Sequence, residues 1–169
     1  MSPKTYIIGD SLIKGFPEEG NRYKTLCFRG LRTEYLQDKI IRGVFDGKLD
    51  GKSSVVISVG TNNLKNKSSE KIAADLLNLV SLLKSRYRGI VVKLCTLVPR
   101  TDKTWLNDKC RQTNKGLRKL CRVNKVDLIQ THKAFVKAKK IKSHLLEEDG
   151  LHLTQSGTLA LQRAILDKV

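Results

Sequence analysis

Short apolar runs alternate with longer amphipathic segments along almost the whole chain. The runs expected to form strands are 4–9, 24–28, 53–59, 90–98 and 126–130, and the third of them reads SSVVISV. An apolar, β-branched run of this kind is typical of a strand that is covered on both faces. The segments expected to form helices, in which apolar residues recur every three or four positions, are 33–46, 69–88, 103–124 and 154–168.

Strands that alternate with helices predict a parallel sheet with helices on both faces. Short connections and right-handed crossovers favour an α/β fold of the flavodoxin-like kind, a three-layer α/β/α sandwich around a five-stranded parallel sheet. With 169 residues, the chain is expected to form one domain, 1–169, with a core large enough to be stable without disulfide cross-links. Its short margins at both ends suggest a domain trimmed from a longer protein.

The composition favours an intracellular protein. No apolar run reaches the roughly 20 residues that a membrane-spanning helix needs, and the N-terminus lacks the pattern of a signal peptide. We therefore expect a cytoplasmic location. The four cysteines contain no CxxC pair and are expected to be reduced, mostly in the core, and not to bind a metal.

Polar residues follow the predicted strands. In parallel sheets with helices on both faces, binding and catalytic groups gather in the loops after the carboxyl ends of the strands. These loops read GDS (9–11), RGL (29–31), GTNN (60–63), PRTD (99–102) and THK (131–133). The first loop presents Ser11 at the edge of the sheet, with Gly9 expected to permit a sharp exit from the strand. An ordinary turn and a held nucleophile are both compatible with GDS alone.

A histidine and a carboxylate stand close together in EEDGLHLTQSG (147–157). Acyl transfer by a serine needs a base, a group that orients the base, and donors for the oxyanion. Asp149 precedes His152 by three residues, so one turn can bring the carboxylate to Nδ1 and leave Nε2 to accept a proton from a serine. A polar turn before a helix is the ordinary alternative.

Four stretches together resemble the sequence blocks of the SGNH (GDSL) hydrolases. They are GDSL at 9–12, Gly30 after the second strand, GTNN at 60–63 and DGLH at 149–152. The resemblance covers 4–168 and implies that family's five-stranded parallel sheet in an α/β/α sandwich. The G-x-S-x-G elbow of the larger α/β-hydrolases is absent from the sequence.

The resemblance implies a role for each block and a carboxylic ester hydrolase as the activity. Ser11 would be the nucleophile, and its backbone N–H would also donate to the oxyanion. Gly30 would supply a second backbone N–H, because glycine lets the loop approach closely, and Asn62 would supply a side-chain amide. His152 would act as base and Asp149 would orient it. The implied substrates are short acyl, acetyl-like esters, including esters of lipids, and no metal or organic cofactor is implied.

Two positions depart from the family pattern. The third block usually ends in Asp, where this chain has Asn63. The second block often has Asn shortly before its glycine, where this chain has Phe28 and Arg29. We therefore expect different local hydrogen bonding at Asn63 and a less certain register for the Gly30 donor.

The chain is strongly basic, with 33 Lys and Arg against 16 Asp and Glu and a net charge of +17. Residues 109–142 contain twelve basic residues and one acid, Asp127. Such a charge attracts RNA, anionic membranes or acidic partners, although a merely solvated face is the alternative. His132 and His144 are expected on this surface. The predicted polyanion-binding residues are Arg111, Lys115, Arg118, Lys119, Arg122, Lys137, Lys139, Lys140 and Lys142.

The sequence leaves three functions open. The first is the esterase, and the second is a non-catalytic or dual-role basic module that binds RNA or anionic membrane. VVISVGTNNL (55–64) and LCTLVPR (94–100) are similar to esterase domains in first-open-reading-frame proteins of LINE-type retrotransposons, and somewhat to small acetylhydrolases of platelet-activating factor. The third is a flavodoxin-like phosphate or nucleotide binder, which has no use for the Asp149–His152 turn.

Overall fold

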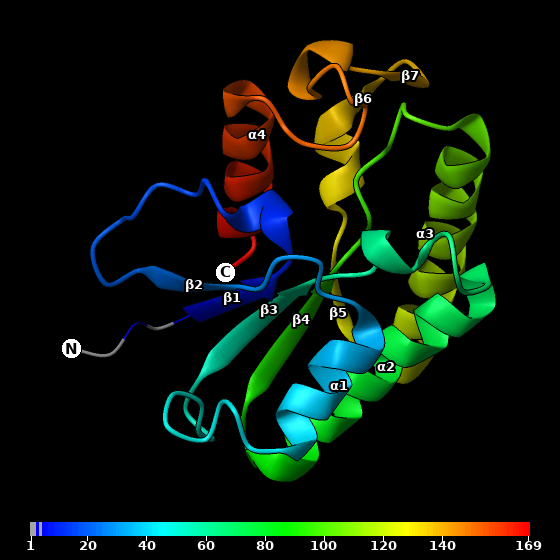
Figure 1. Cartoon of the computed structure of the whole chain (residues 1–169). Helices are drawn as coiled ribbons and strands as arrows, with labels where there is room; N and C mark the ends of the chain where they lie inside the picture. Colours follow the sequence, from blue (N-terminus) through cyan, green and yellow to red (C-terminus); the bar gives the residue numbers. More distant parts are fainter. Residues whose placement is uncertain (1–2, 4) are drawn as a thin grey trace.

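The computed structural model describes residue 3 and residues 5–169. Its central sheet has five parallel strands in the order β2-β1-β3-β4-β5, as Figure 1 shows. The strands are β1 (Thr5–Gly9), β2 (Tyr23–Cys27), β3 (Ser54–Ser58), β4 (Val91–Cys95) and β5 (Asp127–Ile129). Thr5 lies opposite Tyr23 on one side and Ser54 on the other. The direction of winding therefore reverses at β1, and ligands of open α/β sheets bind at the carboxyl end of such a reversal.

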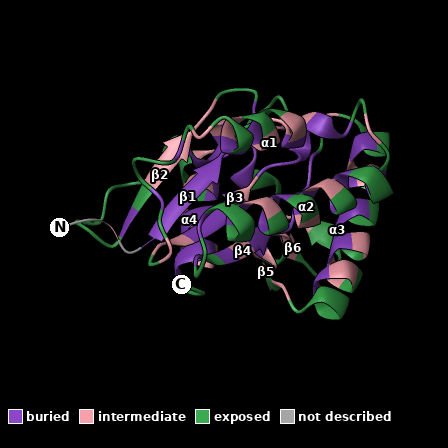
Figure 2. Cartoon of the chain, turned by 90° about the horizontal axis from the view of Figure 1, so that it is seen from below, coloured by how far each residue is buried: buried purple, intermediate pink, exposed green. Residues whose placement is uncertain are grey.

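Helices cover both faces of the sheet. They are α1 (Thr33–Ile41), α2 (Ser69–Arg86), α3 (Thr104–Asn124) and α4 (Gln155–Leu166). Ile8 and Ile57 point into a core shared with α1, α2 and α3, whereas Ile7 and Val56 point into a second core shared with α4. Figure 2 shows buried segments along the strands and on parts of the helices. The three-layer α/β/α sandwich predicted from the sequence is thus confirmed.

Two predicted elements end three or more residues before their expected ends. The helix expected at 33–46 ends at Ile41. Gly43, two residues later, has φ of 78°, a left-handed conformation that ends helices. Val44, expected on the apolar face of this helix, is therefore exposed, and Phe45 is buried instead. The strand expected at 90–98 ends at Cys95, although the chain beyond it remains buried.

Several short elements were not predicted. They are the 3-10 helices η1 (Ser11–Ile13), η2 (Thr61–Asn63), η3 (Thr131–Phe135) and η4 (Ser143–Leu145), and the antiparallel pair β6 (Val136–Lys137) and β7 (Lys140–Ile141). Ala138 and Lys139 join β6 to β7 with φ of 50° and 65°. Two-residue hairpin turns with positive φ usually contain Asn or Gly. Because neither residue occurs at 138 or 139, the sequence does not predict this turn.

Among the helices of the described residues, none combines the length and the apolar character that crossing a bilayer would require.

Candidate active site

Ser11 is the first residue of η1, directly beyond the carboxyl end of β1. Asp10 caps this short helix, and its Oδ1 accepts the Leu12 N–H at 3.0 Å. Gly9 has a negative φ, so the exit from the strand does not depend on a left-handed glycine. A Cβ at Gly9 would lie 2.7 Å from the carbonyl oxygen of Ser58, so glycine is needed for the close pairing of β1 with β3.

The carboxyl group of Asp10 is buried beside Ser11. The residue is only 2% exposed. Burial raises the pKa of Asp10 to about 6, against the opposing effects of the Leu12 N–H and of the charge of His152.

Asp149 and His152 form the pair that their spacing predicts. His152 Nδ1 lies 2.5 Å from Asp149 Oδ2. Asp149 Oδ1 accepts the backbone N–H groups of Leu151 and His152, each at 2.9 Å. The hydrogen bond with His152, together with these two, lowers the pKa of Asp149 to about 2. The carboxylate is therefore ionised at neutral pH, and the turn holds its two oxygens in fixed directions.

Gly30 and Asn62 come together from different loops. Asn62 Nδ2 donates to the carbonyl oxygen of Leu31 at 3.0 Å, which ties η2 to the loop that contains Gly30. Gly30 has φ of 69°, and a Cβ there would meet no atom within 4 Å. The glycine thus satisfies a left-handed backbone conformation, and the open space beside it leaves the expected approach to an oxyanion a prediction.

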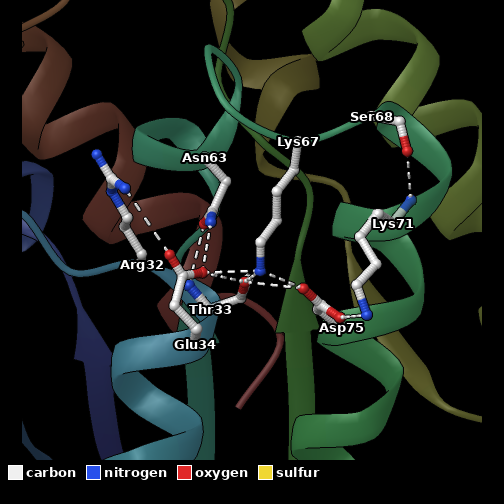
Figure 3. Close-up of polar contacts among 8 residues, drawn as sticks. All are labelled: Arg32, Thr33, Glu34, Asn63, Lys67, Ser68, Lys71 and Asp75. Carbon is white, nitrogen blue, oxygen red and sulfur yellow. Dashed lines mark hydrogen bonds and ion pairs between the residues drawn. The ribbon is translucent and has the colours of Figure 1, made fainter.

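Asn63, which is buried, organises a partly buried polar network that the sequence did not reveal (Figure 3). Its Oδ1 accepts the Thr33 N–H at 3.0 Å, at the start of α1, and its Nδ2 donates to Glu34 Oε2 at 2.9 Å. Lys67 Nζ lies 2.8 Å from the same Glu34 oxygen and 2.7 Å from Asp75 Oδ2. Partial burial raises the pKa of Glu34, but hydrogen bonds from Lys67 and Asn63 outweigh it and hold this pKa at about 2.

This network accounts for one departure from the family pattern. An Asp in place of Asn63 would present a carboxylate to the carboxylate of Glu34, whereas the amide donates to it. The loops after β2 and β3 are thus joined at both Asn62 and Asn63.

The basic residues border a hollow of ≈ 1190 Å³ between α3 and the segment from η3 to β7. We call this hollow the basic groove. Of the nine predicted residues, five line it: Arg111, Lys115, Arg118, Lys139 and Lys140. Lys133, which was not chosen from the sequence, lines it too, and so does a single acid, Asp108. Lys119, Arg122, Lys137 and Lys142 are outside its lining.

His132 lies at the wall of the basic groove and is partly buried. Its Nδ1 lies 2.8 Å from Thr96 Oγ1. Burial, together with the charges of Arg118 and Lys133, lowers the pKa of His132. His144 is exposed, as expected.

Residues 7–159 match the model of the GDSL-like lipase/acylhydrolase family. The chain belongs to this family. The resemblance drawn from its four sequence blocks is therefore confirmed, and hydrolase chemistry follows at the level of the family. The individual roles of Ser11, Gly30, Asn62, Asp149 and His152 stay predictions.

Solved structures of GDSL proteins share the fold. A protein from Streptococcus pneumonia, described in terms of platelet activating factor, is 21% identical over 99% of this chain and 84% of its own, with a TM-score of 0.80. A lipolytic G-D-S-L family member from Veillonella parvula is 14% identical over 97% and 96% of the two chains, with a TM-score of 0.79. The esterase domain of the ZfL2-1 ORF1 protein from a zebrafish retrotransposon is 22% identical over 96% and 95%, with a TM-score of 0.52.

No sequence among curated proteins matches the chain. At these identities the structural likeness establishes the fold alone.

Proposed function

We propose that this GDSL-family chain is a serine esterase that hydrolyses short acyl esters, including esters of lipids. The observation that carries the proposal is the contact of 2.5 Å between His152 Nδ1 and Asp149 Oδ2. An ionised carboxylate at Nδ1 keeps the proton on that nitrogen and leaves Nε2 as the acceptor that a general base needs.

In the proposed reaction, Ser11 Oγ attacks the ester carbonyl carbon while His152 Nε2 takes its proton. The carbonyl π electrons move to oxygen, and the N–H groups of Ser11 and Gly30 and the amide of Asn62 stabilise the resulting oxyanion. Collapse expels the alkoxide, which takes the proton from His152. Water, deprotonated by His152, then attacks the acyl-enzyme, and the carboxylic acid leaves as Ser11 is regenerated.

The test uses p-nitrophenyl acetate and a fluorophosphonate probe. The chain should hydrolyse the ester and bind the probe covalently, and Ser11→Ala should do neither. Ser85→Ala, which changes an exposed serine of α2, is the matched control and should behave as the unchanged chain. An unchanged chain that neither hydrolyses nor labels contradicts the proposal, as does labelling retained in Ser11→Ala.

A second candidate function is binding of a polyanion, either beside the esterase activity or in place of it. The observation that favours it is the basic groove, in which Arg111 and Lys115 of α3 face a wall that carries Lys139 and Lys140. Cations on two walls of a groove suit an extended chain such as RNA better than a flat anionic membrane. An origin in a retrotransposon first-open-reading-frame protein would fit this candidate.

Anisotropy of a labelled single-stranded RNA, measured against salt, tests this candidate, and sedimentation with anionic vesicles tests the membrane form. Binding should weaken steeply with salt. The double variant Arg111→Glu with Lys115→Glu should abolish it, whereas Lys48→Glu, far along the chain from the groove, should change it little. A response that is flat with salt contradicts this second function.

A further inference from the structure

Arg100 is a buried cation in the loop between β4 and α3. It is 5% exposed. Its Nε and Nη2 donate to the two oxygens of Asp102, at 3.1 and 2.5 Å, and its Nη1 donates to the carbonyl oxygen of Thr61 at 3.1 Å. All three guanidinium nitrogens therefore have partners within the protein. Burying such an ion pair adds little net stability, so its contacts call for another reason.

One of these contacts reaches the predicted oxyanion loop. Thr61 is the first residue of η2, and Asn62 follows it. The Asn62 amide is held at its far end by the carbonyl oxygen of Leu31. Arg100 holds the same short helix from the other side, through the Thr61 carbonyl group. The direction of the Asn62 side chain is thus fixed by two loops at once.

The other contact reaches the turn that carries the predicted base. Asp102, held by Arg100, adjoins Thr101, whose N–H donates to the carbonyl oxygen of Gly150 at 2.8 Å. Gly150 has φ of 70°, and a Cβ at this residue would clash with the backbone nitrogen of Asp102. Gly150 lies between Asp149 and the two N–H groups that Asp149 accepts. The loop at 100–102 therefore packs directly against the Asp149–His152 turn and supports it.

We infer that Arg100 is a positioning residue that aligns the Asn62 donor with the Asp149–His152 pair. The inference rests on the proposed esterase function and adds a residue outside the four family blocks. The planar guanidinium group of Arg100 fixes the distance between the loop that contains Thr61 and Asn62 and the loop at 100–102.

The shape of the guanidinium matters as well as its charge. A lysine at this position keeps the charge but offers a single ammonium, which cannot bind both oxygens of Asp102 and reach the Thr61 carbonyl in one plane. Arg100→Lys is therefore the informative substitution. Arg86→Lys is its matched control, because Arg86 also binds both oxygens of an aspartate, Asp46, at 2.8 and 2.7 Å, away from the site.

The readout is kcat for p-nitrophenyl acetate, per site titrated with the fluorophosphonate probe. Loss of one oxyanion donor typically lowers turnover about 10²–10³-fold. A misplaced donor keeps part of its contribution to turnover. Arg100→Lys should therefore lower kcat about 10- to 100-fold and change KM less than about threefold. Asp102→Asn should act in the same direction, and Arg86→Lys should leave kcat per site unchanged.

A double variant separates positioning from folding. If Arg100 acts through Asn62, Arg100→Lys should lower kcat much less in the Asn62→Ala variant than in the unchanged chain. The inference is overturned if the fold-losses in kcat of the two single variants multiply in the double variant. It is also overturned if Arg100→Lys lowers only the number of sites that the probe titrates and leaves kcat per site unchanged. If the unchanged chain is inactive, the esterase proposal fails. If the chain is active and Arg100→Lys keeps its kcat, only the positioning role fails.

Discussion

Restoring the usual family residue at position 63 should destabilise this chain. Asn63 Nδ2 lies 2.9 Å from Glu34 Oε2. In Asn63→Asp, two carboxylates would meet at that distance and repel by about 6 kcal/mol at an effective dielectric constant of about 20. Lys67, 2.8 Å from Glu34, offsets part of this repulsion.

Protonation limits the penalty. The introduced carboxyl group has an ordinary pKa of about 3.9, so keeping its proton in the folded state costs about 4 kcal/mol at pH 7 and about 1.5 kcal/mol at pH 5. We therefore expect a loss of about 2–4 kcal/mol in the free energy of unfolding at pH 7. Because the folded-state pKa of this group is raised, the variant is relatively most stable below about pH 4 and loses stability as the pH rises.

Urea denaturation at pH 7 and pH 5 measures both effects. Adding Glu34→Gln should rescue the variant, since the Gln amide can donate to the new carboxylate and restore one hydrogen bond with its direction reversed. Asn78→Asp, an exposed position on α2, adds the same charge and should change the free energy by less than about 0.5 kcal/mol. Equal stability of Asn63→Asp and the unchanged chain at pH 7, or the absence of rescue, would refute the reasoning.

Three other substitutions test the site. Asp149→Asn should lower kcat/KM by about 10⁴, because an amide at Nδ1 favours the wrong tautomer of His152; ester hydrolysis measures this, and a loss below tenfold would contradict the assigned role. Asn62→Ala should lower kcat about 10²–10³-fold with the fold intact by circular dichroism; an unchanged kcat would exclude it as a donor. Gly30→Ala should cost about 1–2 kcal/mol in a urea titration, because φ is 69° and the space is open; unchanged stability would count against a strained turn.

The sequence predicted what depends on neighbours in the chain. Strands β1 and β3 are readable because their apolar runs are buried on both faces, and the Asp149–His152 pair is readable because three residues separate its members. Arg100 and Thr61 are 39 residues apart, and Asn63 and Thr33 are 30 apart. No local pattern marks such pairs, so the positioning loop and the polar network required the structure.

The glycines show a related limit. A glycine in the sequence does not say whether it is needed for a positive φ or for a close approach. Gly9 is needed for close contact with β3, and Gly30 has a left-handed conformation, and neither reason could be read from the sequence. The turn at Ala138 and Lys139 shows the opposite failure, since its two positive φ values occur without glycine.

The position of β1 inside the sheet has a consequence for the protein as it is made. Both strand partners of β1 are complete once β3 has been synthesised, because β1 pairs only with β2 and β3 in the sheet, whereas η1, which carries Ser11, also packs against α4. The turn that carries His152 is added almost a hundred residues after β3. During translation at roughly 5–20 residues per second, the nascent chain thus passes several seconds with the serine synthesised and no base. Under the proposed mechanism, esterase activity begins only when the last layer of the fold closes, and a prematurely terminated chain is inert.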